Sequence, residues 1–171
     1  MPTANKQETT PGSHTITLPN DEFVKFIERD ILEGHSVTIV AKGWSMRPFL
    51  ENRRDKIVLT PVPSVGLKVG DVVLARTDIG QCVLHRIIKI DGNAITLQGD
   101  GNAFGTENTS TEKVVAKATA FIRKGRSKEE SINSAKWRIY SFFWTHTRPL
   151  RRYFLYIYRH FLADNEKYGS L

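Results

Sequence analysis

The hydrophobic pattern of the chain begins with a helical period. Between Asn20 and Glu33, apolar residues recur at the spacing of one helix face: Phe23, Ile27 and Ile31, with Phe26 beside them. This spacing predicts one short amphipathic helix. Gly34 follows directly and is a residue at which helices commonly end.

The pattern then changes to short β-rich runs separated by turn residues. In the first run, Val37, Ile39 and Ala41 line one face. Asp91-Gly92 separates two later runs and predicts a tight hairpin, because both residue types tolerate positive φ angles. Further strands are predicted at Lys56 to Thr60, Val72 to Arg76, Cys82 to Ile90, Ala94 to Gln98 and Val114 to Ile122.

A second helical pattern occupies the end of the chain, where Pro149 divides the apolar spacing into two helices. The whole pattern predicts a mainly β fold with flanking helices, of the α+β class. We expect four parts: a flexible N-terminal segment (1–19), a β domain with a leading helix (20–122), a charged linker (123–134) and a helical extension (135–171).

Composition and charge separate the last part from the rest. The 171 residues fit one domain with an appendage, and the single Cys82 excludes a disulfide framework and a cysteine-built zinc site. Residues 1–122 carry 14 basic and 14 acidic side chains, whereas residues 123–171 carry 11 and 4. The net charge of +7 therefore lies after Ile122, together with 11 of the 17 aromatic residues.

The basic, aromatic segment 135–163 contains no acidic residue, which leaves three interpretations open. Arginine with Trp, Tyr and Phe suits the headgroup layer of an anionic membrane. The aromatic residues also suit plain packing on the β domain, with solvated arginines. Nucleic-acid binding is the least favoured of the three.

The sequence shows no membrane-spanning or secretory pattern. Residues 1–14 contain no apolar run of the kind found in a signal peptide, and no window reaches about 18 consecutive apolar residues. We therefore expect any membrane contact to be peripheral.

The segment that points to chemistry is Gly43-Trp44-Ser45-Met46-Arg47-Pro48, directly after a predicted strand. A turn at a strand end exposes a serine hydroxyl together with its backbone amide. Such a serine acts as a nucleophile only with a neighbouring base and with donors for the oxyanion. Taken alone, Ser45 is better interpreted as an ordinary polar turn residue.

Three more motifs follow in order: Val69-Gly70-Asp71-Val72-Val73, Val83-Leu84-His85-Arg86-Ile87-Ile88 and Gln98-Gly99-Asp100-Gly101-Asn102. With the Ser45 segment they resemble the LexA and type I signal peptidase group of serine peptidases, and within it the signal peptidases that pair Ser with His. The resemblance covers about residues 37 to 122. It implies a coiled β-sheet catalytic domain and endopeptidase activity on a peptide or pre-protein, without a cofactor or metal.

The resemblance also implies site roles. Ser45 is the expected nucleophile, with Met46 and Pro48 shaping its turn. His85 is the expected general base, for which neutral imidazole suits physiological pH; without the other motifs it would be a histidine hydrogen-bonded inside a sheet. Some relatives carry an oxyanion hydroxyl two residues before the nucleophile, where this chain has Gly43, so the backbone amide of Ser45 must serve.

An acid should orient the imidazole, and two candidates remain open, Asp100 and Glu107. Lys89 is an alternative base, but four residues along a strand put it roughly 13 Å from His85, so the two cannot serve one site. We prefer His85.

Substrate recognition is predicted along the strand that leads to Ser45, where an extended peptide pairs with the strand edge beside Ile39, Ala41 and Trp44. Two other functions remain open. One is a non-catalytic binding module of the same fold that docks on a membrane or on nucleic acid through its basic tail. The other is LexA-like self-cleavage at a small-residue bond, between Ala116 and Ala120 or at Ser134-Ala135.

Overall fold

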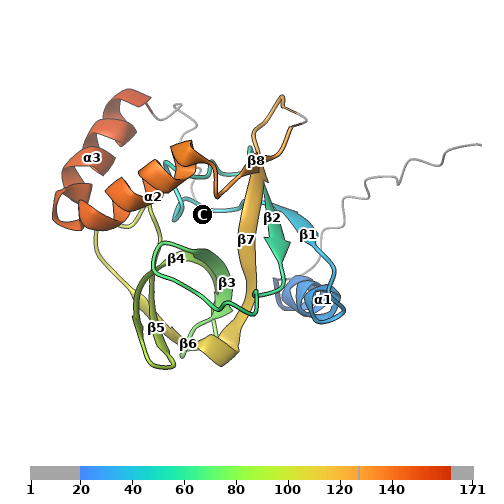
Figure 1. The fold of residues 1–171 in the computed structure, drawn as a ribbon. Helices are drawn as coiled ribbons and strands as arrows, with labels where there is room; N and C mark the ends of the chain where they lie inside the picture. The colour runs from blue at the N-terminus through green and yellow to red at the C-terminus, as the bar shows by residue number, and fades with distance from the viewer. Residues whose placement is uncertain (1–19, 127, 163–171) are drawn as a thin grey trace, which may run out of the picture.

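A single curled antiparallel sheet forms the body of the protein (Figure 1). The computed structural model describes residues 20–126 and 128–162, so the predicted flexible segment 1–19 lies outside the described residues. The strand order is β1-β2-β7-β3-β4-β5-β6, and β8 pairs with β7. The strands are β1 (Val37–Val40), β2 (Lys56–Thr60), β3 (Val72–Arg76), β4 (Cys82–Asp91), β5 (Ala94–Gln98), β6 (Glu107–Ser110), β7 (Val114–Ile122) and β8 (Glu130–Ser131).

The predicted mainly β class is confirmed, and the strand bounds follow the sequence pattern closely. Strands β2, β3, β5 and β7 have the predicted limits, and β4 is one residue longer. Gly92 turns the β4–β5 hairpin with a φ of 57°. Strand β6 was not predicted, because its sequence Glu-Asn-Thr-Ser lacks apolar alternation.

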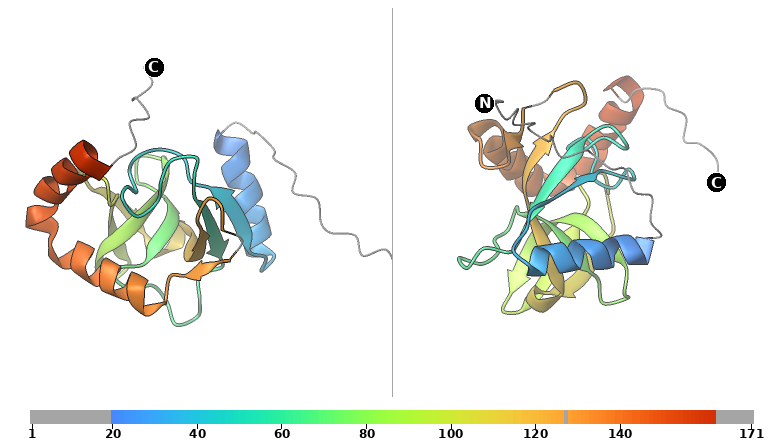
Figure 2. Two further views of the ribbon diagram at one scale, coloured as in Figure 1. Left: turned by 90° about the horizontal axis from the view of Figure 1, so that it is seen from above. Right: turned by 90° about the vertical axis from the view of Figure 1, so that its right-hand side faces the viewer.

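Within the described residues, three α-helices flank the sheet: α1 (Asn20–Leu32), α2 (Ala135–His146) and α3 (Arg151–Ile157). The predicted first helix is confirmed, and Gly34 follows it with a φ of 84°. The predicted break at Pro149 is also confirmed, since a 3-10 turn (Arg148–Leu150) separates α2 from α3. A π-helical turn (Tyr158–Leu162) extends α3. Figure 2 shows α3 on the side of the molecule opposite α1.

Strand β3 is buried on both faces and divides two apolar clusters, as its continuous apolar run allows. Val72 and Leu74 join the larger cluster, which also contains residues from α1, β2, β7 and α2. Val73 and Ala75 join the smaller cluster with residues of β4 and β5. Phe49, from the loop before β2, packs edge-on against the rings of Phe121 and Trp137 in the larger cluster.

The C-terminal part packs on the sheet more closely than the predicted linker and extension imply. Strand β8 lies within segment 123–134 and pairs with β7, and Ile132 packs against the larger cluster. Trp137 and Trp144 of α2 are each only 5% exposed. Helix α2 is therefore part of the folded core.

We predict that Trp137→Ala lowers the free energy of unfolding by about 3–5 kcal/mol, because it removes a buried aromatic side chain. The matched control is Ile139→Ala on the same helix, where the side chain is 68% exposed, and it should change stability by no more than about 0.5 kcal/mol. Urea denaturation measures both. Equal small effects would mean that α2 is a separable appendage.

Candidate active site

Ser45 lies in the loop between β1 and β2, and the loop is anchored on both sides of it. Gly43 has a φ of 91°, a conformation that other residues rarely adopt. Its amide donates to Asn52 Oδ1 at 2.9 Å. After Ser45, the side chains of Met46 and Leu50 are buried in the larger apolar cluster. The serine is thus carried on a turn that the core holds in place.

Asp55 fixes the end of the same loop. Its side chain is fully buried and accepts hydrogen bonds from the Glu51 amide, at 3.0 Å, and from Arg54. It also pairs with Arg123, which follows β7. Burial by itself raises the pKa of Asp55, but these hydrogen bonds and the charge of Arg123 lower it below the ordinary aspartate value. The carboxylate therefore stays charged and ties the loop to the end of β7.

His85 lies on β4 with its side chain almost fully buried, 4% of the residue being exposed. Its Nδ1 lies 2.9 Å from Oε2 of Glu107, the first residue of β6. A carboxylate accepts hydrogen bonds, so Nδ1 is the donor, and in a neutral ring this leaves Nε2 as an acceptor. Of the two acids considered from the sequence, Glu107 contacts the imidazole.

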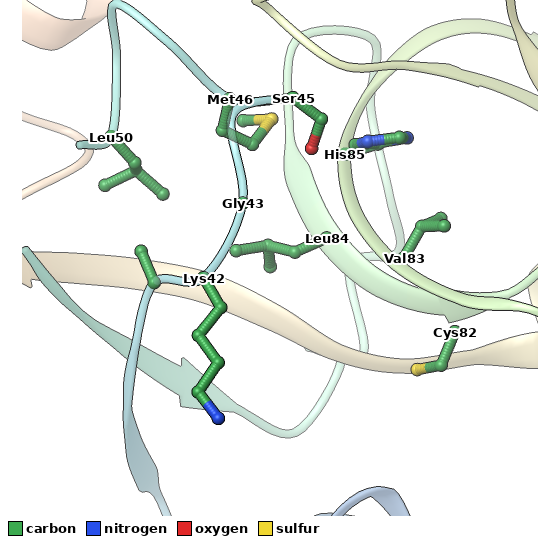
Figure 3. A pocket seen from close by; sticks show the side chains of 10 residues that line it. Lys42, Gly43, Ser45, Met46, Leu50, Cys82, Val83, Leu84 and His85 are labelled. Atoms are coloured by element: carbon green, nitrogen blue, oxygen red, sulfur yellow. The ribbon is translucent and has the colours of Figure 1, made fainter. Parts of the chain in front are cut away.

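Ser45 and His85 line one pocket of about 170 Å³, and Figure 3 shows the hydroxyl and the ring on the same side of it. The other lining residues come from the loop and from β4: Ala41, Lys42, Gly43, Met46, Leu50, Cys82, Val83 and Leu84. Among the described residues, no direct hydrogen bond joins the hydroxyl to the ring. Bonds of this kind often tighten only when substrate binds.

The backbone amide of Ser45 is a candidate oxyanion donor. Within the part of the chain that the structure describes, no group accepts a hydrogen bond from it. The amide of Gly43, in contrast, is already bonded to Asn52. A backbone donor without a partner beside a serine hydroxyl suits a developing oxyanion.

The glycine loop after β5 lies directly against the Ser45 turn. The Gly101 amide donates to the Ser45 carbonyl oxygen at 2.7 Å. A Cβ atom on Gly99 would lie 2.3 Å from that same oxygen and 3.0 Å from Nε2 of His85. On Gly101 it would lie 2.4 Å from the Trp44 carbonyl oxygen. A side chain at either position would overlap backbone atoms of the Ser45 turn, so both positions require glycine.

Asp100, between these glycines, faces away from His85. It is fully buried and forms a two-pronged ion pair with Arg86, at 2.8 and 2.7 Å. Its second oxygen also accepts a hydrogen bond from Tyr140 of α2 at 3.4 Å, and its carbonyl accepts one from Trp144. Burial and the negative charge of Asp100 raise the pKa of Tyr140 well above the usual tyrosine value. Asp100 therefore supports the loop, not the imidazole.

Arg86 was not recognised from the sequence, although a charged residue within the apolar run of β4 was the available signal. It is fully buried, and besides Asp100 it donates to the Gly70 carbonyl oxygen and to Ser141 Oγ of α2. Its guanidinium lies over the ring of Phe49. One buried cation thus joins β4, the glycine loop, α2 and the segment before β3.

Helix α3 and the turn after it also hold the glycine loop. Arg151 is 1% exposed and donates to the Gly99 carbonyl oxygen at 3.3 Å. Arg159 donates to the Gly101 carbonyl oxygen at 3.1 Å. These contacts were missed from the sequence, where arginines in the tail suggested external partners. They make the C-terminal helices a support of the candidate site.

The predicted substrate-binding residues lie along the strand and loop that lead to Ser45. Strand β1 is at one end of the sheet order. Ile39 is half-buried on it, and Ala41 lines the pocket. Trp44 lies under the Arg47 guanidinium, 3.8 Å from its ring centre. Pro48 follows in the same turn.

Lys89 does not reach this pocket, because it is exposed and pairs with Asp91 at 3.1 Å. The bonds between Ala116 and Ala120 lie within β7, between β2 and β3, so they are inaccessible in the folded sheet. Over residues 20–126 and 128–162, no group of three or more His, Cys, Asp or Glu side chains could hold a metal ion. Over the same ranges, every helix is too short or too polar to cross a bilayer.

No protein-family model matches the chain, and a search of curated proteins gives no match.

We predict that substitutions of the two acids near the site lower the stability by very different amounts. Asp100→Asn should cost about 3–5 kcal/mol of stability, because it leaves the buried charge of Arg86 without its partner. Glu107→Gln should cost less than about 1 kcal/mol, because the Glu107 side chain is 23% exposed and the histidine pair is only partly buried. Urea denaturation measures both stability costs. A larger cost for Glu107→Gln than for Asp100→Asn would contradict the assignment of Asp100 as the carboxylate that supports the loop.

We predict that Gly99→Ala displaces the Ser45 turn, because the new methyl group would overlap the Ser45 carbonyl oxygen. Overpacking of this kind costs about 1–3 kcal/mol. The amide resonances of Ser45 and Gly101 should shift in NMR spectra. Unchanged resonances together with unchanged stability would show that the two loops are not in tight contact.

Proposed function

We propose that the protein is a serine endopeptidase of the signal-peptidase-like group. The observation that carries the proposal is that Ser45 and His85, from separate motifs, line one pocket, while Glu107 contacts the His85 ring from outside the pocket lining. Ser45 comes from the loop after β1, His85 from β4 and Glu107 from β6, and the His85 ring contacts Glu107 at 2.9 Å. A nucleophile, a base and an acid that orients the base are the parts that acyl transfer requires.

The proposed reaction begins with attack of Ser45 Oγ on the scissile carbonyl carbon, while Nε2 of His85 takes the hydroxyl proton. The negative charge on the carbonyl oxygen is stabilised by the Ser45 amide. The C–N bond then breaks, and the leaving amine receives the proton from His85. Water attacks the acyl-enzyme by the same route and returns Ser45 to its starting form.

Glu107 supports this cycle by holding the imidazole in one tautomer. Nδ1 keeps its proton against the carboxylate, so Nε2 presents its lone pair to Ser45. When the ring becomes protonated, the adjacent negative charge stabilises the imidazolium. The carboxylate therefore acts in both half-reactions without leaving His85.

The proposed substrate is an extended peptide or a pre-protein segment that runs along β1. A pocket of about 170 Å³ beside Ser45, lined by Ala41 and Gly43 among others, could receive a substrate side chain next to the cleaved bond. The resemblance to signal peptidases also favours small residues before the cleaved bond. We include the fold in the proposal: the curled sheet is interpreted as a signal peptidase/LexA-like catalytic domain.

Cys82 is the competing nucleophile, because its residue lines the same pocket. Burial raises the pKa of its thiol above the usual cysteine value. The thiol is then protonated at neutral pH and reacts poorly, since the thiolate is the nucleophilic form. Ser45 with a histidine base is the better candidate.

The test is cleavage of a diverse synthetic peptide mixture, followed by mass spectrometry. We predict that Ser45→Ala and His85→Ala lower the cleavage rate by about 10³-fold or more, and Glu107→Gln by about 10²–10⁴-fold. Cys82→Ala is the matched control and should keep the wild-type rate. Circular dichroism confirms that each variant is folded.

Three results would contradict the proposal. Cleavage that persists in Ser45→Ala would place the nucleophile elsewhere, and loss of cleavage in Cys82→Ala would assign it to the thiol. Peptide binding without cleavage by the wild-type protein would favour the non-catalytic binding module.

A further inference from the structure

The outward sides of α2 and α3 expose large apolar side chains. Figures 1 and 2 show the two helices along the outside of the sheet, with α3 far from α1. We call the following residues the outer face, all of them between 48% and 77% exposed: Ile139, Phe142, Phe143, Leu150, Tyr153, Tyr156, Ile157 and Phe161. Exposed apolar groups that gather on one side of a protein mark an interaction surface.

Helix α2 is apolar on both of its sides. Trp137 and Trp144 are buried against the sheet, as one helix face requires. Ile139, Phe142 and Phe143 follow the same helical spacing on the opposite side and are exposed. A helix that lies on a protein surface in water normally has one apolar stripe. No group within residues 20–126 and 128–162 covers this second stripe.

Basic side chains flank the apolar stripe of α2. At 100° per residue, Lys136 and Arg138 fall on either side of Ile139 and Phe142, and both are exposed. Arg152 is exposed on α3. No acidic residue occurs from 135 to 163. The outer face thus has an apolar centre and a cationic border.

A basic pocket of about 320 Å³ lies at the start of α2 and adjoins this border through Lys136. Its only acidic lining residue is Glu130, which pairs with Arg126 and Lys136. The buried carboxylate of Asp55 pairs with two more of the lining cations. Positive charge therefore exceeds negative charge around the pocket, and the lining cations are Arg54, Arg123, Lys124, Arg126 and Lys136.

We infer that the outer face docks on the surface of an anionic phospholipid bilayer, with the basic pocket receiving a lipid phosphate. The apolar centre enters the boundary between headgroups and acyl chains, where aromatic side chains are favoured. The cationic border is attracted by the anionic lipid. This inference extends the proposed function by placing the peptidase domain at a membrane surface.

Charge and side-chain type disfavour two other partners for the outer face, a second copy of the chain and nucleic acid. In a symmetric dimer the outer face would meet itself, so cations would oppose cations without a carboxylate between them. Nucleic acid would satisfy the arginines and could stack on the exposed rings, but it would leave the aliphatic Ile139, Leu150 and Ile157 without an apolar environment.

The test is co-sedimentation of the full-length protein with vesicles of phosphatidylcholine alone or with 30% phosphatidylglycerol. We expect binding to the anionic vesicles that weakens as salt is added. Ile139→Ser with Phe142→Ser should weaken it on the order of tenfold. Lys124→Gln and Arg126→Gln, in the basic pocket, should each weaken it by about fivefold.

The matched control is Ile79→Ser with Phe104→Ser, which removes two side chains that are 77% and 76% exposed on other loops. It should bind vesicles like the wild type. Ser45→Ala should also bind unchanged, so a failed peptidase proposal would not affect this result.

The inference is overturned if the protein does not bind anionic vesicles at low salt, or if the control weakens binding as much as the outer-face variant. It is also overturned if light scattering shows a dimer that the outer-face variant dissociates while vesicle binding is absent. Binding to a fluorescent oligonucleotide that the outer-face variant abolishes, again without vesicle binding, would assign the surface to nucleic acid.

Discussion

The buried ion pair between Arg86 and Asp100 is the constraint on which the candidate site depends. Both side chains are fully buried, and removing two charges from water is costly unless their hydrogen bonds are satisfied. Here the cost is offset by two short bonds within the pair and by further bonds to the Gly70 carbonyl oxygen and Ser141. Losing one partner would leave an uncompensated charge in the core.

The ion pair links the strand that carries His85 to the glycine loop that touches the Ser45 turn. Arg86 directly follows His85 on β4, so the same strand turns the imidazole to one face and the buried cation to the other. Asp100 lies between the two glycines whose backbone touches the Ser45 turn. Fixing the pair therefore fixes the distance between β4, which carries His85, and the loop that carries Ser45. The C-terminal helices hold the glycine loop in place: Tyr140 and Trp144 donate hydrogen bonds to Asp100, and Arg151 donates to the Gly99 carbonyl oxygen.

Regular elements could be predicted from the sequence because each has its own local signal. Alternating or continuous apolar runs mark most strands, and Asp91-Gly92 marks a hairpin. Strand β6 has no such signal, since it is fixed by pairing with β5 and by the contact of Glu107 with His85. Ser45 and His85 were predicted from ordered motifs, but the choice between Asp100 and Glu107 depends on which carboxylate faces the ring, and spacing does not encode this. The contacts of Arg151 and Arg159 with the glycine loop were not predicted, because burial of an arginine is a property of the tertiary structure.

The central claim is that this scaffold holds Ser45 and His85 in position to act as nucleophile and base. The most direct measurement is a crystal structure of the protein with a peptide aldehyde whose sequence comes from a cleaved peptide. The account predicts a covalent bond from Ser45 Oγ, an aldehyde oxygen that accepts from the Ser45 amide, and Nε2 of His85 within about 3.2 Å of Oγ. An unmodified Ser45, or a ring still bonded to Glu107 but more than about 6 Å from Oγ, would contradict it.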